Sequence, residues 1–256
     1  MITMGCDVGS LYTKAVIMRD DDVAASRIIP TTGNIGRLID GLLVQVCADA
    51  GIERRQIECL GATGQGADLV SSADFIEDAV NCVAAAAAFF VPEAKAAIDI
   101  GGQSITAMTI TPDGEITNFI RNDKCASGSG RFLEILADKL QIGIDDIDKT
   151  VAQAQKQLKI SNQCGVFVES EVITYLNAGE ATADIMAGIC LSLVNIVSAQ
   201  SRKLREIDCF TVTGGVGHFR NITDALAQKL GSRCQVFPVN TQLAAALGAA
   251  LLEEDD

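Results

Sequence analysis

Met4-Gly-Cys-Asp-Val-Gly-Ser-Leu-Tyr-Thr-Lys14 decides the fold of this chain, because its pattern returns as Ala97-Ile-Asp-Ile-Gly-Gly-Gln-Ser-Ile-Thr106. Each copy consists of an apolar strand, an aspartate, a tight glycine turn, a polar run and a second strand. A duplicated unit of this kind, with helices after it, predicts two similar α/β lobes with a cleft between them.

The rest of the chain alternates between strand and helix patterns. We expect strands over 2–6, 15–19, 23–29, 57–62, 96–100, 105–111, 116–121, 209–213 and 234–237, and helices over 35–50, 78–90, 182–204, 221–230 and 243–252. This order predicts a first lobe over 1–95 and a second lobe over 96–256 that carries Cys125 and Cys164. The C-terminal helix is a candidate to pack back on the first lobe.

The composition argues against several classes of partner. The 256 residues carry a formal net charge of −13, which disfavours nucleic acid and anionic membrane surfaces. Nine cysteines without a secretory signal pattern predict a reducing compartment rather than a disulfide framework. The most apolar window, 80–91, is too short to span a bilayer. We therefore expect a cytoplasmic protein that binds neither nucleic acid nor membrane.

The first two glycine turns have the chemistry of a phosphate site. Gly9 allows close approach of the backbone, and the polar run 10–14 offers hydroxyl groups and a lysine to a phosphate oxygen. Asp7 and Asp99, at the ends of matching strands, are candidates to hold the waters around one Mg²⁺. The chain has no Gly-x-x-x-x-Gly-Lys-Ser/Thr motif and no Gly-x-Gly-x-x-Gly after its first strand, so neither a P-loop nor a Rossmann site is expected.

Cys125 and Cys164 each lie in a small-residue turn that is predicted to open a helix. The positive end of a helix dipole lowers the pKa of a thiol and suits a thiolate or an anionic metal–sulfur centre. Two cysteines are half of the usual ligand set of an iron–sulfur cluster, so a cluster here needs a second chain. Spacing alone favours structural thiols, since no Cys-x-x-Cys is present. The other seven cysteines are expected to be buried packing residues.

Three motifs together resemble a known superfamily. Asp7-Val-Gly-Ser, Asp99-Ile-Gly-Gly-Gln and Thr213-Gly-Gly-Val are similar to the two phosphate motifs and the adenosine motif of the acetate kinase, sugar kinase, heat-shock protein and actin superfamily. The segments 122–133 and 164–173, around the two cysteines, resemble the activator ATPases of 2-hydroxyacyl-CoA dehydratases and the ATPase subunits of benzoyl-CoA reductase. The resemblance runs from about Ile2 to Leu252.

The resemblance implies a two-lobed actin-like ATPase fold, ribonuclease H-like, with duplicated lobes and a nucleotide cleft between them. It further implies a homodimer with one [4Fe-4S] cluster, held by Cys125 and Cys164 of each subunit. ATP with Mg²⁺ would drive one low-potential electron to a partner acyl-CoA dehydratase or reductase component, from a ferredoxin- or flavodoxin-like electron source.

Site residues follow from the same resemblance. The expected catalytic residues are Asp7, Asp99 and Gln103. The expected nucleotide-binding residues are Gly9, Ser10, Leu11, Tyr12, Thr13, Lys14, Gly101, Gly102, Gln103, Gly214, Gly215, Val216 and Gln242.

Two features depart from the family pattern. Leu11 and Tyr12 stand where the first loop of the family often has further small or hydroxylated residues, and the segment Asn81-Cys-Val-Ala has no histidine. The alternative reading is a small-molecule or sugar kinase of the same superfamily, which needs an aspartate base but no cluster. A non-enzymatic sensor or chaperone-like ATPase would also lack iron.

Overall fold

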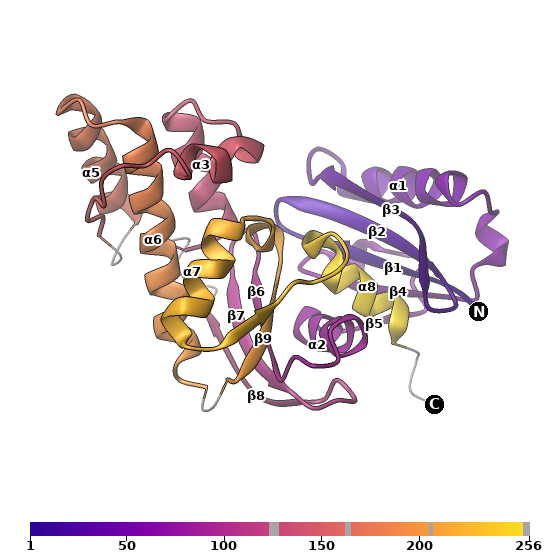
Figure 1. Ribbon diagram of the computed structural model, residues 1–256. Coiled ribbons are helices and arrows are strands. Elements are labelled where there is room, and N and C mark those ends of the chain that lie inside the picture. Colours follow the sequence, from indigo (N-terminus) through magenta and orange to yellow (C-terminus); the bar gives the residue numbers. More distant parts are fainter. Residues whose placement is uncertain (123–127, 162–164, 205–206, 253–256) are drawn as a thin grey trace.

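The computed structural model describes residues 1–122, 128–161, 165–204 and 207–252. These residues form two five-stranded sheets, one in each lobe (Figure 1). The first sheet has the order β3-β2-β1-β4-β5 and the second the order β10-β9-β6-β7-β8. The duplicated lobes of an actin-like α/β fold, predicted from the sequence, are therefore present.

The first sheet is built around β1, which pairs antiparallel with β2 and parallel with β4. Six of the seven residues of β1 are buried, as expected for a central strand covered on both faces. The elements of this part of the chain are β1 (Ile2–Val8), β2 (Tyr12–Arg19), β3 (Asp22–Pro30), α1 (Ile35–Asp49), η1 (Arg54–Gln56), β4 (Cys59–Thr63), η2 (Ala67–Leu69), β5 (Phe75–Ile76) and α2 (Ala79–Phe90).

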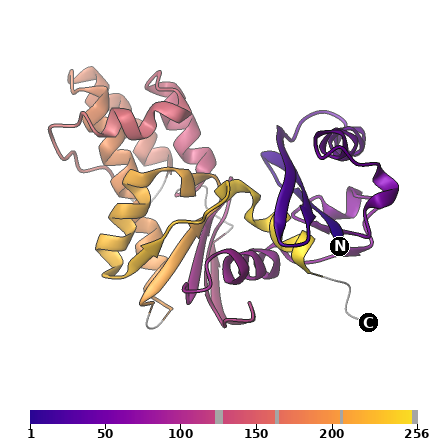
Figure 2. The same ribbon diagram turned by 45° about the vertical axis from the view of Figure 1, so that its right-hand side comes forward.

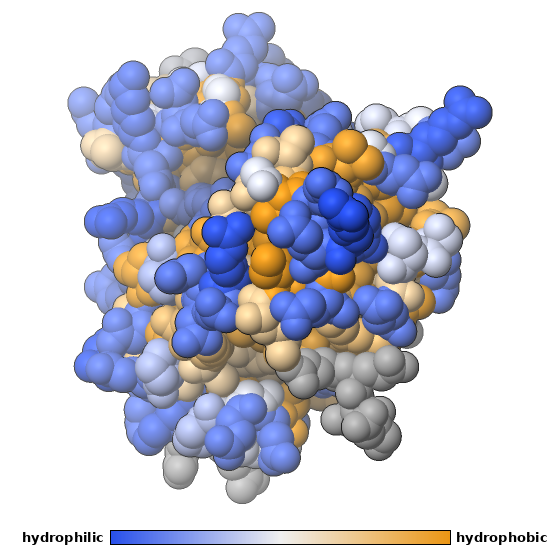
Figure 3. All heavy atoms as spheres, turned by 90° about the vertical axis from the view of Figure 1, so that its right-hand side faces the viewer, coloured by the Kyte–Doolittle hydropathy of each residue, from blue (hydrophilic) through white to orange (hydrophobic). Residues whose placement is uncertain are grey.

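Helix α1 covers the outer face of the first sheet. Asn34 caps it by accepting from the backbone N–H of Arg37 at 3.2 Å, which satisfies one of the free donors of its first turn. Its buried residues recur at helical spacing and pack on β2 and β3: Ile39, Leu42, Leu43, Val46 and Cys47. Hydrophilic side chains cover most of this side of the molecule, with apolar ones between them (Figure 3).

The second sheet is built around β6, which pairs antiparallel with β7 and parallel with β9. The elements of this part are β6 (Ala96–Ile100), β7 (Ile105–Ile110), β8 (Ile116–Asn122), α3 (Gly130–Lys139), η3 (Ile144–Asp146), α4 (Ile147–Val151), α5 (Gly165–Asn177), α6 (Thr182–Ser201), β9 (Cys209–Thr213), η4 (Gly215–His218), α7 (Arg220–Leu230), β10 (Arg233–Gln235), η5 (Thr241–Leu243) and α8 (Ala244–Leu251).

Helix α6 is the central helix of the second lobe and contacts α3, α4, α5 and α7 (Figure 1). By length and composition it could cross a membrane, but 61% of its apolar window is buried inside the protein. Burial of this kind is typical of the core helix of a globular lobe.

Helices α2 and α8 lie between the two sheets and pack on each other (Figure 2). The C-terminal helix α8 packs on β1, β2 and β4 of the first sheet, whereas α2 contacts β6 and β7 of the second. The contacts are close enough to require glycine: a Cβ at Gly5 would lie 1.8 Å from the carbonyl oxygen of Ala246, and one at Gly248 would lie 1.7 Å from that of Cys82. The two halves of the chain thus exchange helices, and the lobe boundary at residue 95 stays a prediction.

The duplication extends to the pairing of individual residues. Asp7 in β1 stands opposite Thr63 in the parallel neighbour β4, and Asp99 in β6 stands opposite Thr213 in the parallel neighbour β9. Each aspartate lies close to the end of its central strand, directly before a glycine turn. The two sheets therefore deliver equivalent carboxylates to equivalent turns.

The elements expected from the sequence are confirmed, with their ends moved by a few residues. The largest differences are at β2, which begins three residues earlier at Tyr12, and at α6, which ends three residues earlier at Ser201. Helices do begin after both cysteine turns, at Gly130 and at Gly165. Cys125 and Cys164 themselves lie outside the described residues.

Candidate nucleotide cleft

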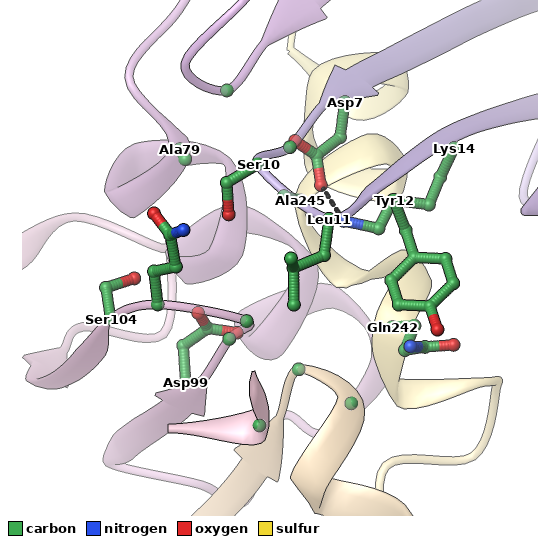
Figure 4. Close-up of a pocket in the computed structure, with 18 of the residues that line it drawn as sticks. Asp7, Ser10, Leu11, Tyr12, Lys14, Ala79, Asp99, Ser104, Gln242 and Ala245 are labelled. Carbon is green, nitrogen blue, oxygen red and sulfur yellow. Dashed lines mark hydrogen bonds and ion pairs between the residues drawn. The ribbon is translucent and has the colours of Figure 1, made fainter. Parts of the chain in front are cut away.

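A cavity of about 680 Å³ lies between the lobes and is lined by both. This volume is typical of a pocket that encloses a small molecule. The sequence-predicted residues that line it are Asp7, Gly9, Ser10, Leu11, Tyr12, Lys14, Asp99, Gly101, Gly102, Gln103, Gly214, Gly215, Val216 and Gln242. Figure 4 shows their arrangement, with the first turn and Lys14 facing the second turn and Asp99.

Asp7 and Lys14 form an ion pair in the first half of the cleft, with 2.7 Å between Oδ2 and Nζ (Figure 4). Their strands bring them together, because they are directly opposite in the β1–β2 ladder. The turn after β4 closes on the same carboxylate: Gly64 has a φ of +91°, and a Cβ there would lie 2.4 Å from Asp7 Oδ1. Glycine is therefore required at this position on two independent grounds.

Asp99 is the equivalent carboxylate in the second half. The hydroxyl of Thr213 donates to its Oδ1 at 2.8 Å. Burial raises the pKa of Asp99, whereas the hydrogen bond from Thr213 and the charge of Lys14 oppose that shift and the charge of Asp7 adds to it. The strand end is held by Gly214, where a Cβ would lie 2.3 Å from the carbonyl oxygen of Ile100.

The two phosphate-type turns are constructed alike. The N–H of Gly9 donates to the carbonyl oxygen of Tyr12 at 3.1 Å, and the N–H of Gly101 donates to that of Ser104 at 2.9 Å. Each hydrogen bond thus closes the turn that connects the strand carrying the aspartate to the next strand. A buried and a half-buried carboxylate with one lysine, between turns of this kind, suit a divalent cation and phosphate oxygens.

The third turn is tied to the segment before α8. The N–H of Gly214 donates to the carbonyl oxygen of Thr241 at 2.9 Å, and the Thr241 hydroxyl donates back to the carbonyl oxygen of Gly214 at 2.7 Å. Beside this pair, Gln242 lies against Gly215, with its Nε2 3.0 Å from where a Cβ would stand. Gln242 and the turn over 214–216 therefore form one surface of the cleft.

Thr13 does not line the cleft. Its side chain is fully buried, and its hydroxyl shares a hydrogen bond with Thr31 Oγ1 at 2.9 Å. Thr31 in turn donates to the carbonyl oxygen of Gly9 at 2.9 Å, so Thr13 lies behind the first turn and supports it. This position therefore does not support the expected contact of Thr13 with nucleotide.

Several lining residues were not expected from the sequence. Glu77 and Asp78 reach the cleft from the segment before α2, where Asp78 caps the helix by accepting from the N–H of Val80 at 2.7 Å. Glu77 accepts from Asn81 Nδ2 at 2.9 Å. The second lobe adds further unexpected lining residues, which include Arg121, Glu134 and Asp145. An N-cap signal marks Asp78 in the sequence, whereas no local pattern marks the others.

Comparison with known proteins now decides the family. The model of the BadF/BadG/BcrA/BcrD ATPase family matches residues 4–252. This chain belongs to that family. It is an ATPase, as the sequence resemblance predicted. The two-lobed ATPase architecture predicted from the motifs is confirmed as well.

Full-length relatives of this ATPase are known. It is 34% identical over 258 residues to the 2-hydroxyisocaproyl-CoA dehydratase activator of Clostridioides difficile, covering 100% of this chain and 96% of that protein. It is 35% identical over 252 residues to the (R)-2-hydroxyglutaryl-CoA dehydratase activating ATPase of Acidaminococcus fermentans, covering 97% of this chain and 95% of that protein.

Solved structures agree with these matches. The activator of the 2-hydroxyisocaproyl-CoA dehydratase from Clostridium difficile with bound ADPNP has a TM-score of 0.91 at 34% identity, over 98% of this chain and 93% of that chain. A ROK family glucokinase from Streptomyces griseus has a TM-score of 0.64 at 12% identity, over 98% of each chain, which shows the fold alone.

Proposed function

We propose that this ATPase activates a partner acyl-CoA dehydratase or reductase component by coupling ATP hydrolysis to the delivery of one low-potential electron. The observation that carries the proposal is the interlobe cleft, in which two equivalent aspartate turns approach from the two sheets. The full-length likeness to two dehydratase activators supports the choice of partner.

In the proposed nucleotide site, Asp7 and Asp99 would hold Mg²⁺, and Lys14 would neutralise phosphate charge. Gln103 lies in the second turn and is the proposed residue for orienting the attacking water. The surface formed by Gln242 and residues 214–216 receives the adenosine. Hydrolysis in such a site depends on positioning and electrostatic stabilisation rather than on covalent chemistry.

The proposed cluster ligands are Cys125 and Cys164, both outside the described residues. Of the seven other cysteines, Cys59 and Cys234 are half-buried and the remaining five are buried. Burial raises the pKa of the Cys6, Cys82 and Cys190 thiols to about 12, so they stay protonated and act as packing groups.

The place of Cys164 in the sequence favours a thiolate at this residue. In the sequence it directly precedes Gly165, the first residue of α5, and the positive end of a helix dipole stabilises negative charge. Four cysteine thiolates would hold a [4Fe-4S] cluster, which would supply one-electron transfer. We propose that two chains contribute two cysteines each, which makes the active form a homodimer. A ferredoxin- or flavodoxin-like donor and a cytoplasmic location complete the proposal.

Iron and acid-labile sulfide per dimer test this function on anaerobically purified protein. We expect about four of each in the wild type and in Cys234→Ala, whose half-buried side chain packs against the core of the second lobe, and a loss of both in Cys125→Ala. Asp99→Asn should retain the iron and lose ATPase activity. An iron-free wild type that still hydrolyses ATP after attempted cluster reconstitution would contradict the electron-transfer role.

A further inference from the structure

The first glycine turn touches the second lobe at two points. Leu11 lies directly against the second turn, since a Cβ at Gly102 would come within 2.7 Å of Leu11 Cδ1. Tyr12 reaches farther, and its hydroxyl donates to Glu134 Oε1 in α3 at 3.3 Å. Figure 4 shows Leu11 and Tyr12 both projecting into the cleft from the first turn. The contact at Tyr12 therefore joins the two lobes across the cleft.

Helix α3 is connected to the second turn through its backbone. The N–H of Gly130 donates to the carbonyl oxygen of Gly101 at 2.9 Å, and the N–H of Arg131 donates to that of Gly102 at 3.0 Å. Because these bonds join the first turn of α3 to the phosphate-type turn, the two move together. The hydrogen bond from Tyr12 to α3 therefore also connects the first turn to the second turn of the site.

Tyr12 is a hydrogen-bond donor over the whole physiological pH range. Its partial burial raises the pKa of the phenol, and the charge of Glu134 raises it further. Arg131 pairs with the other carboxylate oxygen of Glu134 at 3.2 Å, which holds that side chain in place. The phenol therefore remains a donor, and the ion pair with Arg131 orients the carboxylate that accepts from it.

We infer that Tyr12 is a positioning residue. The hydrogen bond from its hydroxyl to Glu134 acts as a latch that holds the two lobes together and slows the release of nucleotide from between them. The inference rests on the proposed nucleotide cleft. The bond exists only at this separation of the lobes, and a nucleotide held by both lobes favours the same separation. Since each favours the observed separation of the lobes, each stabilises the other.

The test is the release rate of a fluorescent ADP analogue, followed by stopped-flow displacement with excess ATP. Tyr12→Phe keeps the ring and removes the hydroxyl, and we expect release to become about three- to tenfold faster, as for the loss of one partly buried hydrogen bond. Tyr175→Phe is the matched control. Its hydroxyl donates to the carbonyl oxygen of Lys159 at 2.9 Å within the second lobe, so its loss should leave release unchanged.

Variants of Glu134 separate a latch from a direct contact with nucleotide. Glu134→Gln retains an acceptor oxygen and should release at nearly the wild-type rate, whereas Glu134→Ala should match Tyr12→Phe. Adding Tyr12→Phe to Glu134→Ala should have no further effect. A Tyr12→Phe protein with wild-type release, or an effect of Tyr12→Phe that persists without the Glu134 carboxylate, overturns the latch alone. A wild type that fails to bind the analogue overturns the nucleotide cleft and the latch with it.

Discussion

Replacing Thr213 with valine removes the hydroxyl that donates to Asp99 Oδ1 at 2.8 Å and leaves the branching of the side chain unchanged. That hydrogen bond favours the ionised form of Asp99, because it opposes the burial that raises the pKa of this carboxyl. Its loss therefore raises the pKa further. At any given pH the ionised fraction of Asp99 falls, and with it the fraction of protein that can hold Mg²⁺.

The size of the effect follows from the surroundings of the pair. Hydrogen bonds to charged groups contribute about 1.5–3 kcal/mol, which corresponds to a change of about one to two units in the pKa of Asp99. Thr213 is fully buried, so water cannot take the place of its hydroxyl. Asp99 also lines the cavity, however, and water on that side offsets part of the loss. We expect a rise of about one unit.

The pH dependence of kcat/KM for ATP hydrolysis measures this change, because kcat/KM reports the ionisation of the free protein. Activity should fall as the pH drops through the pKa of Asp99, and in Thr213→Val this acidic limb should lie about one unit higher. Thr211→Val is the matched control on the same strand, since the buried hydroxyl of Thr211 has no hydrogen-bond partner within the described part of the chain. Coincident acidic limbs for wild type and Thr213→Val would refute the reasoning.

Three further results are expected. Thr211→Val should raise the free energy of unfolding by about 1–2 kcal/mol, because it removes a buried hydroxyl that has no partner among the described residues. Urea titration measures the change, and a lower free energy of unfolding would contradict the prediction. Gly248→Ala should lower the same quantity by about 1–3 kcal/mol through its clash with Cys82, whereas Gly41→Ala, in open space on α1, should raise it by about 0.5–1 kcal/mol. Lys14→Met should weaken ATP binding in calorimetry by about tenfold or more, and an unchanged Kd would exclude Lys14 as a phosphate ligand.

Much of the cleft could be predicted from the sequence because its parts are local and repeated. An aspartate followed by a glycine turn is visible at residues 7–9 and again at 99–101, and the duplication implies that the two lie in equivalent places. Thr13 shows why a run of consecutive residues in the sequence does not all reach the site. Side chains alternate along a strand, so Tyr12 and Lys14 share the face toward the cleft and Thr13 points to the other.

Other parts of the cleft depend on how distant segments pack. Glu134 and Asp145 reach the pocket only because α3 and the segment after it lie beside the second turn. No spacing or composition around these residues distinguishes them from surface carboxylates. For α8 the first lobe is a candidate position, but its apolar sequence by itself indicates only that the helix is buried, and the contacts with β1, β2 and β4 depend on long-range packing.

The position of α8 has a consequence for the order in which the protein is assembled on the ribosome. The strands of the first sheet are synthesised first, but the helix that fills the space beside Gly5 comes from residues 244–251, at the far end of the chain. Domains usually fold from the N-terminus as they emerge during translation. Here the N-terminal sheet keeps one apolar face uncovered until residues 244–251 have also been synthesised.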